Sequence, residues 1–344
     1  MPVTAPQSSP TGAPSSTRTR VAIAGATGYA GQELVRILAR HPAVTLTAAM
    51  SSGAGSPARA LPALARIWDG DVVPLDVERL VADADIIFLA LPEAASAALA
   101  PTLVERGRRV IDLSGAFRIR DTGARARWYP ATSALPDGTV YGFSERNRDA
   151  IRSARLLSNP GCYPTAALMA LAPLADAGLL VGNVVIDAKS GVSGAGKTPS
   201  DRTHFSENHG SVAAYGIFSH RHVAEMEQEL SMPVTFVPHL VPLDRGILET
   251  IYASLKPGVT AAQVEDALKA AHGDAPFVRL TGADLPEIKH VAHTNFCDIG
   301  WKVDEARHRV VLVSVIDNLV KGAAGSAVQN LNVLLGLDER TGLL

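Results

Sequence analysis

Apolar and polar positions along residues 20–160 form blocks of two kinds, which predict strands followed by helices. Four short apolar runs are typical of buried strands: RVAIAGA, VTLTAAM, ADIIFLALP and RRVIDLSG. Two segments between them have the spacing or composition of helices: GQELVRILARHP and the alanine-rich EAASAALAPTLVERG. Strands that alternate with helices predict a parallel, doubly wound α/β sheet.

The pattern changes after Cys162. We expect a helix over about 164–177, the strand NVVIDAKSGVSG, a polar stretch rich in glycine, serine and histidine over 193–219, and a helix over about 219–230. Strands with fewer helices between them follow: VTFVPHLVP, GILETIYASL, FVRLTG, TNFCDIGWKVD and RVVLVSVID. This order predicts an α+β domain with a largely antiparallel sheet.

These two patterns set the expected boundaries. We expect a disordered tail over 1–19, an α/β domain over 20–160 and an α+β domain over 161–318. A last helix, GAAGSAVQNLNVLLGL, begins after Asn318. The length of 344 residues and the apolar fraction of 47 % suit two domains with sizeable cores.

Charge and cysteine content narrow the class of protein. The net charge is −2 and neither sign is concentrated in a block, which argues against nucleic acid as a partner. Two cysteines form no disulfide framework, which suits a reducing compartment. There is no H-E-x-x-H or paired-cysteine motif, so we expect no metal site.

The N-terminal segment and the most apolar window bear on location. Residues 1–20 are rich in Pro, Ser and Thr and have no apolar signal-peptide core, so we expect a cytoplasmic protein, with organellar import left open. The window 166–186 contains Asp176, Gly178, Gly182 and Asn183. It is interpreted as a helix, a turn and a strand rather than as a membrane span.

A glycine loop opens the first helix. VAIAGATGYAGQELVRIL places Gly25, Gly28 and Gly31 between a strand and a helix. Glycine lets backbone approach a pyrophosphate, which binds at a helix N-terminus. A dinucleotide site is therefore predicted, the alternative being a tight turn without a ligand.

The second strand indicates which dinucleotide binds. In sites for NAD, an acidic residue stands at the end of this second strand. Here no acidic residue occurs between His41 and Arg59. Ser51, Ser52 and Arg59 are suited instead to the 2′-phosphate of NADP, although the serines are also ordinary turn residues.

Cys162 lies in the segment LSNPGCYPTAALMAL, between a tight turn and an apolar helix. There, free amides and the helix dipole stabilise a thiolate, and the same amides stabilise an oxyanion on an attacked carbonyl. We therefore expect a nucleophile, the alternative being a small buried residue.

The segment FSHRHVAEMEQEL offers a base for that cysteine. If Ser219 caps this helix, His220 and His222 lie in its first turn, about 200° apart and pointing in different directions. One of them then serves as acid or base, while the other, or Arg221, holds substrate.

Two more segments offer groups that bind anions. KSGVSGAGKTPS combines glycines, serines and Lys197, a composition suited to a phosphate or carboxylate. DLSGAFRIRD places Ser114 and Arg118 at the end of a parallel strand, the edge where such sheets bind ligands. Ordinary loop chemistry is the alternative for both.

Taken together, GATGYAGQEL, DLSGAFRIRD, SNPGCYPTA, SGVSGAGK, HRHVAEMEQEL and VPHLVPLDRGILET resemble the N-acetyl-gamma-glutamyl-phosphate reductase family, in the aspartate-semialdehyde dehydrogenase-like group. The resemblance covers about residues 20–344. It implies a Rossmann dinucleotide-binding domain, to which the C-terminal helix within 319–344 returns, and an α+β catalytic domain. It also implies a homodimer or homotetramer.

The implied reaction is the NADPH-dependent reduction of N-acetyl-L-glutamyl 5-phosphate to the 5-semialdehyde in arginine biosynthesis, through a thioacyl enzyme on Cys162. His222 is the first choice for acid or base and His220 the second. The resemblance places these residues at the NADP(H) cofactor: Gly25, Thr27, Gly28, Tyr29, Ala30, Gly31, Leu91, Pro92, Ser193, Gly194 and Asn318. For the substrate, an acyl phosphate, we expect Ser114, Arg118, Asn159, Lys197, Arg221 and Arg245.

Other functions are consistent with these residues. The same chemistry on an aspartyl or aminoadipyl phosphate, free or bound to a carrier, is the nearest alternative. A phosphorylating aldehyde dehydrogenase of general metabolism and a non-catalytic NADP-binding sensor are the others. A sensor needs neither Cys162 nor the His-Arg-His segment.

Overall fold

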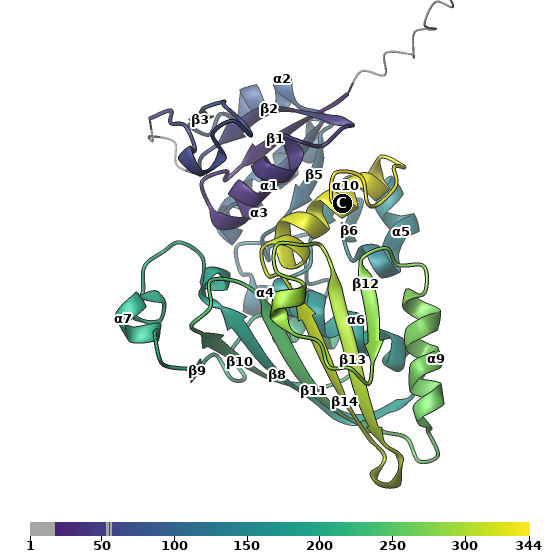
Figure 1. Ribbon diagram of the computed structural model, residues 1–344. Helices are drawn as coiled ribbons and strands as arrows, with labels where there is room; N and C mark the ends of the chain where they lie inside the picture. Colours follow the sequence, from purple (N-terminus) through teal and green to yellow (C-terminus); the bar gives the residue numbers. More distant parts are fainter. Residues whose placement is uncertain (1–17, 53–54, 56) are drawn as a thin grey trace, which may run out of the picture.

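The computed structural model describes residues 18–52, 55 and 57–344, so nearly all of the expected N-terminal tail lies outside it. The described residues form two seven-stranded sheets, one above the other in Figure 1. In that part of the chain, no helix has the length and apolarity needed to cross a membrane.

The first sheet is parallel throughout, as predicted. Its order is β3-β2-β1-β4-β5-β7-β6. The strands are β1 Thr19–Ala24, β2 Val44–Met50, β3 Val72–Val73, β4 Ile86–Leu89, β5 Arg109–Asp112, β6 Thr139–Tyr141 and β7 Leu156–Ser158. The helices are α1 Tyr29–Leu38, α2 Val77–Asp83, α3 Glu93–Glu105, α4 Thr122–Trp128 and α5 Ser144–Ser153.

Alternation along the central strands builds a core on each face of this sheet. Val21 and Ile23 of β1 pack in one core with α1, while Ala22 and Ala24 pack in the other with α2 and α3. Because successive strand residues point to opposite faces, an apolar run such as RVAIAGA serves both cores.

The second sheet is mixed and mostly antiparallel, with the order β12-β13-β14-β11-β8-β10-β9. The pairs β8–β10 and β12–β13 are parallel, and the others are antiparallel. The strands are β8 Leu180–Gly191, β9 Ala213–Ala214, β10 Val234–Val241, β11 Ile247–Leu255, β12 Val278–Gly282, β13 Cys297–Asp304 and β14 Arg309–Ile316.

Helices cover one face of the second sheet. They are α6 Cys162–Asp176, α8 His222–Leu230 and α9 Ala261–His272, and α6 is buried along nearly all of its length. The short helix α7 Phe205–Asn208 lies on a loop that projects from the body (Figure 1). Short 3-10 turns span Pro62–Leu64, Val192–Ala195, Asp201–Thr203, Ile288–His290 and Glu305–Arg307.

The C-terminal segment returns to the first sheet. A π-helical turn, Val320–Ala324, leads directly into α10 Gly325–Leu334. Val328 and Leu331 of α10 share a core with Val21 and Leu34. Nε2 of His41 also lies 2.9 Å from Oδ1 of Asn332, and Figure 1 shows α10 between α1 and α5. The end of the chain thus completes the core of its beginning.

Candidate active site

A strand, a turn and a helix present Cys162. β7 ends at Ser158, and Asn159, Pro160 and Gly161 turn the chain into α6, which begins at Cys162, two residues before its predicted start. No side chain caps this helix, and its first turn contains no acidic residue. Pro164 has no N–H, the Tyr163 N–H faces the sulfur and the Thr165 N–H bonds to Gly161. The N–H of Cys162 itself is therefore the group at this helix N-terminus that is suited to an incoming oxyanion.

Cys162 borders a cleft of about 470 Å³ between the two sheets. Most of the predicted site residues line it: Gly28, Tyr29, Ala30, Gly31, Leu91, Pro92, Ser114, Arg118, Cys162, Ser193, Gly194, Lys197, Arg221, His222 and Asn318. Eight predicted residues do not: Gly25, Thr27, Ser51, Ser52, Arg59, Asn159, His220 and Arg245.

The glycine loop fits a dinucleotide. A Cβ on Gly25 would overlap the carbonyl oxygen of Ala90, and one on Gly31 would overlap that of Gly25. These close approaches bring the first turn of α1 against the sheet. That turn has no acidic residue and no side-chain cap, so its N–H groups are free for a pyrophosphate.

Lys197 reaches this loop from the other sheet. Its Nζ donates a hydrogen bond of 2.6 Å to the carbonyl oxygen of Thr27 and lies 5.0 Å from the centre of the Tyr29 ring. Burial and the positive charge of Arg59 lower the pKa of Lys197. The charge of Arg59 thus adds to that of Lys197 near the glycine loop, and two positive charges there favour an anionic ligand.

The end of β2 is only partly described. Ser51 is buried and Ser52 is exposed, while Arg59 is exposed and pairs through its backbone with Val72. Asn318 lines the cleft together with Ser193 and Gly194. Its Oδ1 accepts from the N–H of Gly246 at 2.7 Å, and its Nδ2 donates to Oγ of Ser193 at 2.9 Å. Asn318 thus holds the loop that contains Ser193 and Gly194.

The prediction that Ser219 caps α8 is wrong. The helix begins at His222, and Ser219 lies in a turn closed onto Gly216, in which Phe218 has a left-handed φ of 57°. The His220 ring takes the capping role, because its Nδ1 accepts from the N–H of His222 at 3.2 Å.

The expected divergence of the two histidines is therefore also wrong. His220 precedes the helix, and the two ring centres lie 4.7 Å apart. Only His222 lines the cleft with Cys162. His220 packs behind it, among Tyr163, Tyr215 and Phe236.

Both histidines are neutral near pH 7. Burial, and then the nearby Arg221 guanidinium, lower the pKa of His220 to about 4. Burial and the positive groups around His222 hold its pKa well below the usual value. Nη1 of Arg118 lies 3.3 Å from Nε2 of His222. Because Arg118 can only donate, this contact assigns the ring proton to Nδ1 and the lone pair to Nε2.

Arg118 is buried and holds the turn before Cys162. Its Nε donates to the carbonyl oxygen of Asn159 at 2.8 Å, and its Nη2 donates to that of Leu113 at 2.8 Å. Gly161 is required at this turn, because a Cβ there would lie 2.5 Å from Nε2 of His222 and 2.8 Å from Nη1 of Arg118.

Glu225 is a site residue that was not predicted from the sequence. Its carboxylate is fully buried, and its Oε1 accepts from the N–H of Gly161 and from the hydroxyl of Tyr141, both at 2.8 Å. Its Oε2 lies 3.4 Å from Nη1 of Arg118. A signal was present, because Glu225 follows His222 by three residues and lies next to the apolar Met226 on the same helix.

Other predicted substrate residues already have protein partners. Arg245 forms ion pairs with Glu33 at 2.8 Å and Asp317 at 3.1 Å, so it bridges the two domains and is not a free cation. Arg221 pairs with Glu93 at 3.0 Å.

Two polar residues near the cleft are also engaged. Ser114 donates to Asp112 at 2.7 Å. Asn159 is buried, with its Nδ2 donating to the carbonyl oxygen of Ala323 at 3.3 Å. Among the described residues there is no group of three or more His, Cys, Asp or Glu arranged to hold a metal.

The free thiol is not preset as a thiolate. Burial raises the pKa of Cys162 to about 11, and the Arg118 guanidinium and the Tyr163 N–H offset only part of that effect. A thiol with a raised pKa needs a base to become the nucleophile.

Two family descriptions match the chain. "Semialdehyde dehydrogenase, NAD binding domain" matches residues 20–154, and "Semialdehyde dehydrogenase, dimerisation domain" matches residues 162–318. Relatives named N-acetyl-gamma-glutamyl-phosphate reductase include the protein of Brevibacillus brevis, 45 % identical over 94 % of this chain and 97 % of its own length. That of Geobacillus stearothermophilus is 46 % identical with the same coverage. The chain belongs to this reductase family.

Solved structures support the fold of this reductase-family chain. Aspartate semialdehyde dehydrogenase II from Vibrio cholerae has a TM-score of 0.71 at 22 % identity and covers 93 % of this chain and 99 % of its own. The enzyme from Candida albicans, described with NADP, has a TM-score of 0.69 at 16 % identity, with the same coverage. The predicted fold class, a Rossmann domain with an α+β domain, is confirmed. As a member of the reductase family, the chain is an oxidoreductase with a nicotinamide-cofactor domain.

Proposed function

We propose that this chain catalyses the NADPH-dependent reduction of N-acetyl-L-glutamyl 5-phosphate to N-acetyl-L-glutamate 5-semialdehyde with release of phosphate, a step of arginine biosynthesis. The observation that carries the proposal is the position of Cys162, at an uncapped helix N-terminus on a cleft shared with the glycine loop. The relatives named for this reaction, aligned over 94 % of the chain, support the choice of substrate.

The cofactor site extends from the glycine loop to Asn318. The first turn of α1, from Gly28 to Gly31, would hold the pyrophosphate, with Lys197 beside it and Arg59 towards the 2′-phosphate. Leu91, Pro92 and Asn318 would border the nicotinamide, next to Cys162. When bound, NADPH supplies a hydride to the acyl carbon held on Cys162.

Acylation of Cys162 requires a base. We assign that role to neutral His222, whose Nε2 lies beside Gly161, the residue before Cys162. To take the proton of the thiol, Nε2 would exchange the hydrogen bond that it accepts from Arg118 for that proton. The Sγ thiolate attacks the acyl carbon, the C–O bond to phosphate breaks, and His222 passes its proton to the departing phosphate. A thioacyl enzyme remains on Cys162.

The N–H of Cys162, at the start of α6, would stabilise the tetrahedral oxyanions before and after reduction. Collapse of the second oxyanion restores a carbonyl and breaks the bond between carbon and Sγ. The semialdehyde leaves, and the thiolate takes up a proton from solvent. Burial raises the pKa of the Cys162 thiol, and a thiolate of high pKa is a poor leaving group. The positive charge of Arg118 near the turn stabilises the departing thiolate.

For the substrate anions we propose Arg118, Arg221 and Ser114, which line the cleft. Lys197, predicted from the sequence to hold substrate, lies instead against the glycine loop, and we assign it to the cofactor. Asn159 and Arg245 we assign to support of the turn and of the domain junction.

We further propose a homodimer or homotetramer in the cytoplasm. Residues 162–318 match a dimerisation domain. In β10 and β11 the residues between the buried ones are partly exposed, including Tyr252 at 46 %. They lie on the sheet face opposite the helices, and this face is our candidate for contact with a second copy.

The test is steady-state reduction of NADP with N-acetylglutamate 5-semialdehyde and phosphate, for the unaltered chain and for Cys162→Ser. Aspartate semialdehyde serves as the control substrate. Activity that requires phosphate, prefers the acetylated substrate and collapses in the variant is the expected result. Turnover of the control alone would change the substrate and keep the mechanism, whereas cofactor binding without any turnover would favour a sensor.

A further inference from the structure

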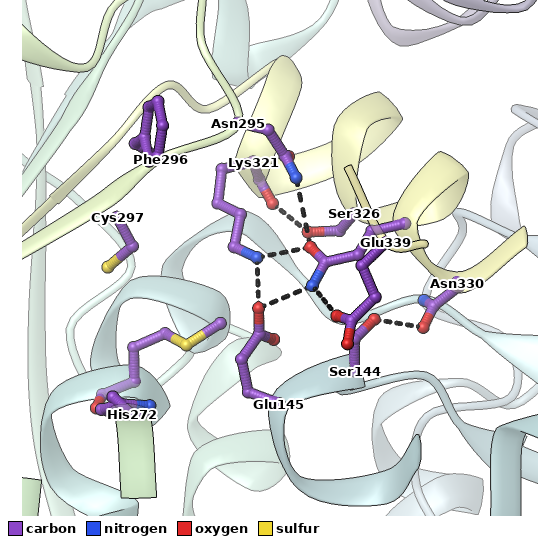
Figure 2. A network of polar contacts seen from close by, with 12 residues as sticks. Ser144, Glu145, His272, Asn295, Phe296, Cys297, Lys321, Ser326, Asn330 and Glu339 are labelled. Atoms are coloured by element: carbon purple, nitrogen blue, oxygen red, sulfur yellow. Dashed lines mark hydrogen bonds and ion pairs between the residues drawn. The ribbon is translucent and has the colours of Figure 1, made fainter. Parts of the chain in front are cut away.

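A cluster of polar side chains, fully buried at one end and partly exposed at the other, lies outside the residues that line the cleft. We refer to Glu145, Lys321, Gln329, Glu339 and Arg148 as the junction network. Figure 2 labels Glu145, Lys321 and Glu339 of this network. Glu145 and Arg148 come from α5 of the first domain, and Lys321 and Gln329 come from the π-helical turn and α10. None of these residues takes part in the proposed reaction.

Lys321 carries a buried charge. Its side chain is 1 % exposed and that of Glu145 is 3 % exposed. Its Nζ donates to Oε1 of Glu145 at 2.6 Å and to Oε1 of Gln329 at 2.7 Å. The ammonium also lies 5.6 Å from the centre of the Phe277 ring. A buried ammonium group has no water to solvate it, so it depends on these protein partners and stays close to them.

Gln329 joins the pair to the rest of the network. Its Nε2 donates to Glu145 at 2.9 Å and to Glu339 at 2.7 Å. Its Oε1 accepts from Lys321 and, at 3.1 Å, from Asn295. All four hydrogen-bonding positions of this amide are therefore used, which fixes its orientation.

The charges in the network balance. Lys321 faces Glu145, and Arg148 faces Glu339 at 2.6 Å. Burial alone would raise the pKa of Glu145, but the Lys321 ammonium and its hydrogen bonds bring that pKa below the usual value. The two pairs differ in exposure, because the side chain of Arg148 is 32 % exposed and that of Glu339 is 15 % exposed.

The residues next to Lys321 form a wall of the active site. In the π-helical turn, the N–H of Gly322 bonds to the carbonyl oxygen of Asp317, and that of Ala324 bonds to Leu319. Gly322 and Ala323 line the cleft, and a Cβ on Gly322 would lie 2.8 Å from Cβ of Cys162. Thus one residue of the turn is anchored in the network while its neighbour packs against the nucleophile.

A second contact ties the same turn to the segment before Cys162. The carbonyl oxygen of Ala323 accepts from Nδ2 of Asn159 at 3.3 Å. Oδ1 of Asn159 accepts from Nδ2 of Asn330 on α10 at 3.0 Å. A displacement of the turn would therefore be passed to both sides of the nucleophile. Turns of π-helix are frequent at functional sites, where an extra residue redirects side chains.

We infer that Lys321 and Glu145 are positioning residues for the reaction: their buried ion pair anchors the π-helical turn whose Gly322 and Ala323 fix Cys162 against the cofactor and substrate. This inference rests on the proposed role of Cys162. It predicts a defect in the chemical step with little change in binding, because the pair touches neither substrate nor cofactor.

The test compares Glu145→Gln with Glu339→Gln. Both variants change one network carboxylate to an amide, and both carboxylates accept from Gln329 and face one cation. Only the first leaves Lys321 as a buried cation without a counter-charge. We expect Glu145→Gln to lower kcat about tenfold or more, with KM and the NADPH Kd within about threefold. Glu339→Gln should keep kcat within about twofold.

The rate of alkylation of Cys162 gives a second readout. It should change in Glu145→Gln and stay unchanged in Glu339→Gln. If Glu145→Gln and Glu339→Gln both fold and have equal kcat and equal rates of Cys162 alkylation, the inference is overturned. This holds even if the two variants differ in Tm. If Glu145→Gln does not fold, Gly322→Ala applies the test directly, because the added methyl group presses on Cys162. In that case an unchanged kcat would overturn the inference.

Cys162→Ser separates this inference from the proposed function. If that variant stays active, the proposed nucleophile is wrong. If it is inactive while Glu145→Gln and Glu339→Gln behave alike, only the positioning role fails.

Discussion

The backbone N–H of Gly161 donates a hydrogen bond of 2.8 Å to Oε1 of Glu225, a buried carboxylate 64 residues further along the chain. This bond fixes the residue before the nucleophile to the helix that carries His222. Because the other oxygen of Glu225 faces Arg118, one side chain orders both the turn and the buried cation beside it.

Loss of the Glu225 charge should destabilise the protein. In Glu225→Gln, Arg118 stays buried without its nearest counter-charge, and we expect a loss of about 3 kcal/mol in the free energy of unfolding. Urea denaturation measures this loss. Glu78→Gln, which breaks the exposed pair with Arg106, is the control and should cause no measurable change. Equal midpoints for the two variants would contradict the assignment.

A methyl group on Gly161 should disable the site without unfolding it. The backbone of Gly161 has φ −66° and ψ 155°, which alanine readily adopts, but its Cβ would displace His222 and Arg118. We expect kcat of Gly161→Ala to fall about 100-fold, with little change in the NADPH Kd. Gly123→Ala, which meets only Asp121 at 3.4 Å, is the matched control. Full activity of Gly161→Ala would show that the close approach is not needed.

Alkylation of Cys162 in the free enzyme should keep rising with pH. With a thiol pKa of about 11, the thiolate fraction increases about tenfold per pH unit between pH 7 and pH 10. Iodoacetamide labelling followed by peptide mass spectrometry measures the rate. Cys297, which is fully buried with a pKa of about 12, is the internal control and should remain unlabelled. A plateau below pH 8 would instead indicate a stabilised thiolate.

Variants of Lys197 and Arg59 should have different effects, because we assign Lys197 to the pyrophosphate of the cofactor and Arg59 to its 2′-phosphate. We expect Lys197→Met to raise the Kd of both NADPH and NADH about tenfold, because Lys197 lies at the glycine loop. Arg59→Met should weaken NADPH alone, since NADH has no 2′-phosphate. Fluorescence titration of the reduced cofactors measures both. Lys289→Met, which breaks a surface pair with Glu287, is the control. Unchanged affinities would remove these residues from the cofactor site.

The sequence predicted the fold class and most of the longer elements, but it missed the helices α5 and α9. The four predicted strands of the first domain correspond to β1, β2, β4 and β5. The strands that were not predicted, β3, β6, β7 and β9, have two or three residues each, too few to show an alternating pattern. The start of α6 was placed two residues late, because Pro164 suggested a first helical position.

The predictions for the candidate site depended more on tertiary contacts. Cys162 was singled out for its predicted place at a helix N-terminus, a local feature. The preference for His222 over His220 came from the family resemblance and not from the local pattern. The contact of His220 with His222 depends on the left-handed backbone of Phe218. Phenylalanine rarely adopts this conformation, so the sequence does not predict the turn. Arg245 looked like a free cation, because Glu33 and Asp317 are far from it in sequence.

The return of α10 to the first sheet has a consequence during protein synthesis. Domains generally fold as they emerge, beginning with the N-terminal one. Here Val21 and Leu34 share their core with Leu331, and His41 contacts Asn332, 291 residues later. While the ribosome is still translating the second domain, the first therefore exposes apolar surface that only the last helix covers. The domain that is made first is completed only at the end of translation.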